Sequence, residues 1–185
     1  MVGTRLIKFR NRDPRRNLPL AVSSKRGEAN FLGAFERALM AEQKVGMGGR
    51  HFELAGYGVT DLIWINRGWD LDMKRNSKKI QKKAQNRLCH LTAFEMKLEN
   101  WRKALLQAYR FSYFADRAIV VLPTENVHRA QAHLHLFCEM DVGLWAFDQR
   151  ERLIERIHTP KRAKARNLKA KNKALRLLSS YIDLG

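Results

Sequence analysis

The chain has 185 residues, of which 36 are Lys or Arg and 18 are Asp or Glu, so its formal net charge is +18 at pH 7. This length suits one domain with its own core, and 45% hydrophobic residues with only four prolines exclude wholesale disorder. No apolar run approaches the ~20 residues of a membrane-spanning helix, and the N-terminus lacks an apolar signal core, so we expect a soluble, cytoplasmic protein without a membrane partner.

The positive charge is concentrated in three segments. Residues 1–26 carry a net charge of +7, residues 67–87 carry +6 and residues 150–176 carry +9, which leaves −4 for the remainder. Clustered Lys and Arg bind nucleic acid largely by releasing its condensed counterions. The pattern therefore favours nucleic acid as the partner, with a solvated tail, an assembly arm or an anionic membrane surface as alternatives.

The first predicted element is a helix over residues 28–44, because Phe31, Leu32, Phe35 and Leu39 recur at helical spacing. The glycine-rich residues 45–50 are expected to form a turn that ends this helix. They lack the Lys-Ser/Thr of a phosphate-binding loop and follow a helix rather than a strand. A strand is expected next within 50–66, where the chain becomes apolar at 60–65.

A basic insertion over residues 66–90 follows, and we expect it to form a loop or a surface helix. The chain returns to a strand at 91–98, and Asn100 is a plausible N-cap for a helix that runs to about residue 114. Residues 118–122 are a short apolar strand of the kind buried in the middle of a sheet. A helical stretch at 125–136 and a strand at 142–147 complete an α-β-β-β-α-β order, which predicts an α/β sandwich with a mixed central sheet flanked by helices.

The residues with the clearest chemistry are Asp61, Glu95 and Lys97. Glu95 and Lys97 are two apart in a strand, so both project from one face, and burying such charges is costly unless they pair or hold a cation. If the strand that follows Asp61 runs antiparallel to this one, Asp61 lies beside Glu95. Two carboxylates without nearby His or Cys suit Mg²⁺ or Mn²⁺. A buried acid–lysine ion pair is the alternative.

Three segments together resemble the PD-(D/E)xK nuclease superfamily, which has the restriction-endonuclease-like fold. They are GVTDLIWI (58–65), LTAFEMKL (91–98) and WRKALLQAYRFSYFADRAIVVLP (101–123), and the resemblance covers roughly residues 25–148. Thr60 stands where the family name has Pro. The resemblance implies an αβββαβ core in which Asp61 and Glu95 bind Mg²⁺ or Mn²⁺ and Lys97 assists the attacking water.

The same resemblance implies two accessory positions. Gln107, on the helix after the second motif strand, would assist at the active site. Many members carry a Glu on the first helix, and Glu28 is a better candidate for this further metal ligand than Glu36, because it opens the helix in line with its apolar face.

We therefore expect a metal-dependent DNA endonuclease, which could act as a homodimer because cutting both strands needs two centres. The alternative is a nuclease-fold protein that binds nucleic acid without cutting it. The expected organisation is a basic arm (1–24), a nuclease-like domain (25–148) and a basic helical tail (149–185). The expected nucleic-acid contacts are Lys74, Arg75, Lys78, Lys79, Lys82, Lys83, Lys103, Arg110, Lys161, Arg162, Lys164 and Arg166.

Other metal sites have little support in the sequence. Cys89 and Cys138 are far apart in the chain and lie in no Cys/His cluster, so neither a disulfide framework nor a zinc site is expected. His133 and His135 would share a face only in a strand, and no third ligand lies at a useful spacing. We interpret them as ordinary surface or core histidines.

Overall fold

The structure, a computed structural model, describes residues 4–7, 24–43, 45–67, 89–161 and 163–182. In chain order its elements are β1 (Thr4–Ile7), α1 (Ser24–Glu42), β2 (Gly46–Arg50), β3 (Glu53–Leu54), β4 (Gly58–Val59), β5 (Leu62–Arg67), β6 (Cys89–Met96), α3 (Trp101–Phe111), β7 (Arg117–Pro123), α4 (Val127–Gln131), α5 (Leu134–Met140), β8 (Gly143–Asp148), β9 (Leu153–His158) and α6 (Leu168–Ile182). Within these ranges no helix is long and apolar enough to cross a membrane.

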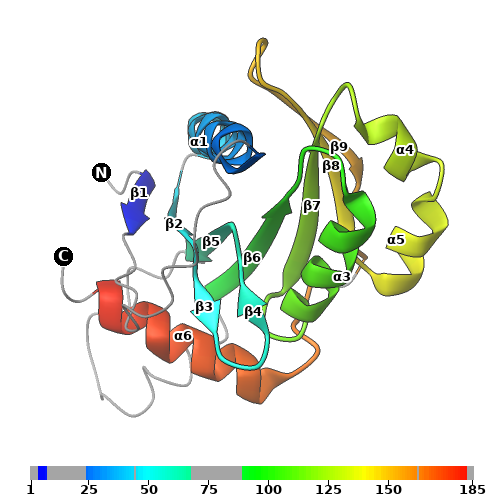
Figure 1. Ribbon diagram of the computed structural model, residues 1–185. Helices are drawn as coiled ribbons and strands as arrows, with labels where there is room; N and C mark the ends of the chain where they lie inside the picture. Colours follow the sequence, from blue (N-terminus) through cyan, green and yellow to red (C-terminus); the bar gives the residue numbers. More distant parts are fainter. Residues whose placement is uncertain (1–3, 8–23, 44, 68–88, 162, 183–185) are drawn as a thin grey trace, which may run out of the picture.

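The fold is an α/β fold built on a seven-stranded mixed sheet with strand order β1-β2-β5-β6-β7-β8-β9 (Figure 1). Strands β2, β5 and β6 are antiparallel in turn, and β7 and β8 then continue parallel to β6. Strand β9 returns antiparallel along one edge, and β1 pairs in parallel with β2 at the other. The predicted α/β class with a mixed central sheet flanked by helices is confirmed.

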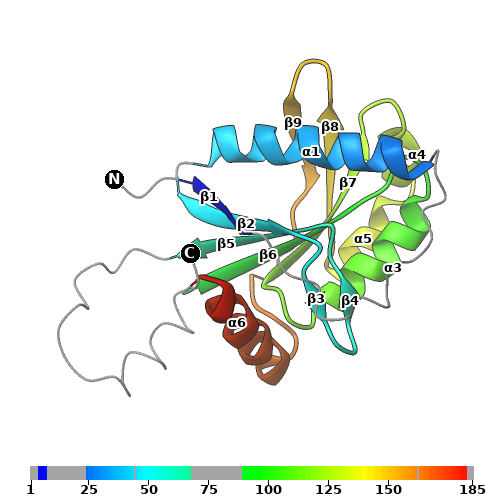
Figure 2. The ribbon, with the colours of Figure 1, turned by 60° about the vertical axis from the view of Figure 1, so that its left-hand side comes forward.

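The helices divide between the two faces of the sheet. Helix α1 lies across one face, while α3 and α6 lie on the other (Figure 2). Alternation along β6 follows this division: Phe94 and Met96 belong to the core beneath α1, whereas Leu91 and Ala93 belong to the core beneath α3 and α6. Glu95 shares the parity of Leu91 and Ala93, so the strand directs it away from α1.

Helix α1 covers its face with aromatic contacts that the predicted apolar stripe supplies. The Phe35 ring meets Phe94 of β6 and Phe147 of β8 edge to face, with centroids 5.3 and 5.5 Å apart. Phe35 is fully buried, and its neighbours Phe31 and Leu39 are nearly so. This packing fixes the direction of α1 over the sheet and thereby places Glu28 near the end of β6.

Helix α3 begins at the predicted cap. The Asn100 side chain accepts a hydrogen bond of 3.1 Å from the backbone N–H of Lys103, which satisfies one of the free donors of the first turn. Its buried residues recur at helical spacing and face β6 and β7: they are Trp101, Ala104, Leu105, Ala108 and Phe111. The helix thus follows β6 directly and covers the face onto which Glu95 projects.

The expectation of a turn at residues 45–50 is wrong, because Gly46–Arg50 forms strand β2, which pairs with β1 and β5 in the sheet. The glycines leave room for a large neighbour. A Cβ on Gly46, whose φ is +150°, would lie 2.7 Å from the Trp64 ring, and one on Gly48 would lie 2.9 Å from it. Apolar side chains do not alternate along β2, because the indole of Trp64 in β5 occupies the space that they would fill.

The later elements follow the predicted order with additions. The helical stretch expected at 125–136 is two short helices, α4 and α5, and the strand expected at 142–147 is β8. Residues 149–185 were expected to form a basic helical tail beyond the domain. The structure instead places β9 in the sheet and buries one face of α6 in the core, so this region is part of the body up to residue 182.

The remaining basic segments fall mostly outside the described residues. Of the insertion expected at 66–90, the first two residues extend β5 and the last two begin β6. The other insertion residues, 68–88, lie outside the described ranges, as do most of the expected arm at 1–24 and Arg162.

Candidate active site

Two carboxylates are brought together by the pairing of β5 with β6. Asp61 immediately precedes β5, and the antiparallel register places Leu62 opposite Phe94, which sets Asp61 beside Glu95. The antiparallel pairing assumed from the sequence is therefore confirmed. In the chain, the basic insertion connects the other ends of these two strands, Arg67 of β5 and Cys89 of β6.

Lys97 completes the cluster from the residue after β6. Its Nζ lies 3.1 Å from Glu95 Oε1 and 3.7 Å from Glu28 Oε2, and it donates a hydrogen bond of 2.9 Å to the carbonyl oxygen of Met96. The exposed fraction of the side chain is 1% for Glu95, 17% for Lys97 and 37% for Glu28. The ammonium thus lies between a buried and a solvent-facing carboxylate.

Asp61 is held in place by the backbone of the neighbouring strand. Its Oδ2 accepts a hydrogen bond of 2.7 Å from the N–H of Met96, which fixes the carboxylate against the end of β6. Burial raises the pKa of Asp61 above its ordinary value, although the charge of Lys97 and the hydrogen bond from Met96 act in the opposite direction. Oδ2 of Asp61 is therefore bonded to the backbone N–H of Met96, whereas the other oxygen, Oδ1, is not.

Glu95 is the most perturbed group of the cluster. Burial, followed by the negative charge of Asp61, raises its pKa to about 8, and the contact with Lys97 only partly offsets these effects. Its Oε2 is buried and has no hydrogen-bond partner in the described part of the chain. Near neutral pH, Glu95 therefore retains a proton unless a further cation approaches that oxygen.

Lys97 stays charged in this setting. Burial acts to lower its pKa, but the charges of Glu95, Asp61 and Glu28 outweigh burial and raise the pKa above the ordinary lysine value. Near neutral pH, Lys97 therefore presents a positive charge beside two strand-end carboxylates.

The donor set fits a hard divalent cation in its chemistry. Asp61 and Glu95 offer only oxygen, and the bare Oε2 of Glu95 is a buried acceptor that a cation would satisfy. Within the described ranges, however, no three His, Cys, Asp or Glu side chains gather closely enough to hold a metal ion. Glu28 accordingly contacts Lys97 and does not join Asp61 and Glu95 as a third ligand in this conformation.

Gln107 lies on α3, on the face of the sheet toward which Glu95 projects. Its Oε1 is buried and lacks a hydrogen-bond partner among the described residues. No hydrogen bond joins its amide oxygen to the acidic cluster. Glu36, the weaker sequence candidate on α1, is buried and forms a bidentate pair with Arg50 at 2.6 and 2.7 Å.

The expected nucleic-acid contacts that can be placed fall into two groups. Lys103 and Arg110 are exposed on α3, and Lys161 and Lys164 are exposed between β9 and α6. Arg166 is different, because it donates to Ser112 Oγ and to the Met140 carbonyl, at 2.9 and 2.8 Å. Arg166 thus connects the segment before α6 to the end of α3 and to α5. The other expected contacts, at Lys74, Arg75, Lys78, Lys79, Lys82, Lys83 and Arg162, lie outside the described residues.

The histidines His133 and His135 pack against each other and against an aromatic ring. His133 precedes α5 and stacks on Trp101, with ring centroids 5.1 Å apart, and the His133 and His135 rings are tilted at 6.1 Å. A histidine that sequence reasoning passed over lies nearer the acids: the N–H of His51 donates to the Asp61 carbonyl at 3.1 Å, and its charge acts to lower the pKa of Asp61. Only the pairing of β2 with β5 places it there.

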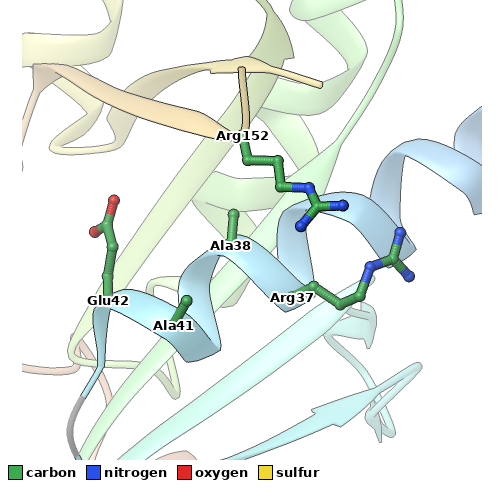
Figure 3. Close-up of a pocket in the computed structure, with 5 residues that line it drawn as sticks. All are labelled: Arg37, Ala38, Ala41, Glu42 and Arg152. Carbon is green, nitrogen blue, oxygen red and sulfur yellow. The ribbon is translucent and has the colours of Figure 1, made fainter. Parts of the chain in front are cut away.

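A surface hollow of about 280 Å³ lies elsewhere, between α1 and the β8–β9 turn (Figure 3). Arg37, Ala38, Ala41 and Glu42 line it from α1, and Arg152 reaches over it from the turn. Glu42 is already paired with Arg156. The hollow contains none of the residues singled out from the sequence, so the acidic cluster at the end of β6 remains the candidate site.

Comparison with known proteins identifies no relative, so the interpretation of the site depends on the geometry of this cluster. No protein-family model matches the chain, and neither a curated protein nor a solved structure matches it.

Proposed function

We propose that this protein is a metal-dependent DNA endonuclease of the PD-(D/E)xK type, with Asp61, Glu95 and Lys97 at its centre. The observation that carries the proposal is the convergence of these three residues from neighbouring strands, with one oxygen of Glu95 buried and bare. A buried acceptor without a partner costs free energy, and a cation bound at this oxygen would remove that cost.

The topology around the cluster supports a restriction-endonuclease-like core. Helix α1 precedes the antiparallel strands β2, β5 and β6, and α3 then leads to β7, which is parallel to β6. This order places the acids at one end of adjacent strands, beside the start of α3. Lys97 and Glu28, whose side chains are 17% and 37% exposed, are the members of the cluster that a phosphodiester would meet first from solvent.

Each residue then has a defined task. Asp61, fixed by the Met96 N–H, and Glu95 would hold Mg²⁺ or Mn²⁺, which would polarise the phosphate and lower the pKa of a bound water. Lys97 keeps its proton and supplies positive charge where negative charge develops on the phosphate. Glu28 holds the Lys97 ammonium from the α1 side, and exposed cations such as Lys103 and Arg110 contact the DNA backbone.

One observation favours the alternative of a nuclease-fold protein that binds nucleic acid without cutting it. The Lys97 ammonium already lies between Glu95 and Glu28 and contacts the Met96 carbonyl, so it neutralises the acids without a metal. In that case the cluster would be a structural ion pair at the end of β6, and the basic surfaces alone would carry the function.

Plasmid cleavage separates the two functions. The wild type is expected to nick or linearise supercoiled DNA with Mg²⁺ or Mn²⁺, and chelator is expected to stop the reaction. Asp61→Ala and Glu95→Ala should abolish cleavage while binding to DNA persists. Glu99→Ala, which removes an exposed acid from the same segment, should cut normally. Binding without cleavage under every metal condition would establish the non-cutting alternative.

A further inference from the structure

Helix α6 carries a stripe of cations on its solvent side. Lys169, Lys173 and Arg176 are exposed and recur at i, i+4 and i+7, so they lie along one face of the helix. Residues 159–182 contain no Asp or Glu, and within the described chain none of the three forms an ion pair. The stripe therefore presents uncompensated positive charge.

The opposite side of α6 is anchored in the protein core. The residues that anchor it are Ala170, Ala174, Leu175 and Leu178, all buried beneath the sheet. Beside them Lys171, which is 8% exposed, donates to both carboxylate oxygens of Asp116, at 2.8 and 2.7 Å. An apolar face and a buried ion pair together prevent the helix from rolling, so the stripe has a fixed direction.

The segment leading into α6 is fixed as well. The backbone N–H of Arg166 donates to the Ser112 carbonyl at 3.0 Å, and that of Asn167 donates to the Tyr113 carbonyl at 2.9 Å. The Asn167 side chain then accepts from the N–H groups of Lys169 and Ala170, which caps the first turn. This region is therefore a helix docked on the core, whereas the sequence suggested a basic helical tail outside the domain.

The stripe and the acidic cluster lie at opposite ends of β6. Asp116, which holds Lys171, also accepts a hydrogen bond of 2.9 Å from the N–H of Leu91. Leu91 precedes Glu95 by four residues on the same side of the strand, which is about 13 Å of extended chain. Helix α6 also covers the face of the sheet onto which Glu95 projects (Figure 2).

We propose that Lys169, Lys173 and Arg176 form a rigid docking stripe for the phosphate backbone of duplex DNA, separate from the acidic cluster and on the same face of the sheet. The inference rests on the proposed function in that both take DNA as the partner. A duplex is stiff over this distance, since its persistence length is about 50 nm, so one that binds at the acids and runs along β6 would reach the stripe without bending. A single strand is flexible, so binding along the same path would cost conformational entropy that a duplex does not lose.

The test is the salt dependence of binding to a 16-base-pair duplex in the presence of chelator, which prevents cleavage. Substituting Lys169→Gln, Lys173→Gln and Arg176→Gln together should reduce the slope of log K against log[salt] by about 2.7, since each lost phosphate contact contributes ~0.9. The control variant Arg37→Gln, Arg150→Gln and Arg152→Gln removes the same charge from exposed positions on α1 and the β8–β9 turn. It should keep nearly the wild-type slope.

An unchanged slope in the stripe variant, or an equal loss in the control variant, would overturn the proposal. An equal loss of affinity for a 16-nucleotide single strand would overturn its assignment to duplex DNA. The substituted side chains are exposed, so the thermal midpoint of both variants should match the wild type. If the stripe variant shows the expected reduction in slope but the wild type never cuts DNA, the proposed hydrolysis is refuted. The proposal that the stripe binds duplex DNA is then still supported.

Discussion

Strand β6 has a buried acid and a lysine at each end, and the two pairs are built differently. At its start, Asp116 accepts hydrogen bonds from Leu91, Ala165 and Lys171, so both of its oxygens are used. At its end, Glu95 meets Lys97 through one oxygen only, lies beside a second carboxylate and has its pKa raised to about 8. A satisfied pair holds elements together, whereas an unsatisfied one is suited to binding something more.

The largest effect should come from breaking the satisfied pair. Asp116→Ala leaves the ammonium of Lys171 buried and unpaired, so we expect the free energy of unfolding to fall by about 3–5 kcal/mol. Denaturant titration measures this change. Glu42→Ala, which breaks the exposed pair with Arg156, should change stability by less than about 1 kcal/mol. Similar losses in the two variants would show that Asp116 is not an anchor.

Substitution of Glu95, at the other end of β6, should increase the free energy of unfolding rather than decrease it. The pKa of Glu95 is raised from 4.5 to about 8, so its contribution to stability is full below pH 4.5 and is lost as pH rises through 8. Glu95→Gln keeps the shape without the charge, and at pH 9 it should raise the free energy of unfolding by about 2–4 kcal/mol. At pH 4 the two proteins should be nearly equal. Denaturation curves that differ by the same amount at both pH values would contradict this account.

The sequence predicted the parts of the site that depend on local pattern. Asp61 before an apolar strand, Glu95 and Lys97 two residues apart, and the cap at Asn100 can all be recognised from short segments. What it missed depends on distant partners. Strand β2 was mistaken for a turn because Trp64, from another strand, fills the space that its own side chains would occupy.

The C-terminal region was misjudged for a similar reason. Its many lysines and arginines hide the short apolar face of α6, whose small residues Ala170 and Ala174 give little hydrophobic signal. The bond between Asp116 and Lys171 joins residues 55 positions apart, and no local pattern indicates it. The raised pKa of Glu95 likewise depends on burial, which only the assembled sheet reveals.

A substitution at Lys97 should separate its two roles. Under the proposed function, Lys97→Met removes the charge that would stabilise the reacting phosphate, so we expect cleavage to fall by about 100- to 1,000-fold. The same change removes the ammonium that contacts Glu95 and Glu28, so Mn²⁺ should bind several-fold more tightly. Calorimetric titration and single-turnover cleavage measure the two effects. Weaker Mn²⁺ binding in this variant would contradict the arrangement described here.

The most direct test of the central claim is a calorimetric titration of the metal-free protein with Mn²⁺ at pH 7, in buffers of different ionisation enthalpy. Because Glu95 holds a proton at this pH, the wild type should bind the cation and release close to one proton to the buffer. Glu95→Gln should lose this proton release and most of the affinity. A wild type that binds no Mn²⁺, or a Glu95→Gln variant that binds it equally well, would contradict the claim that the bare oxygen marks a cation site.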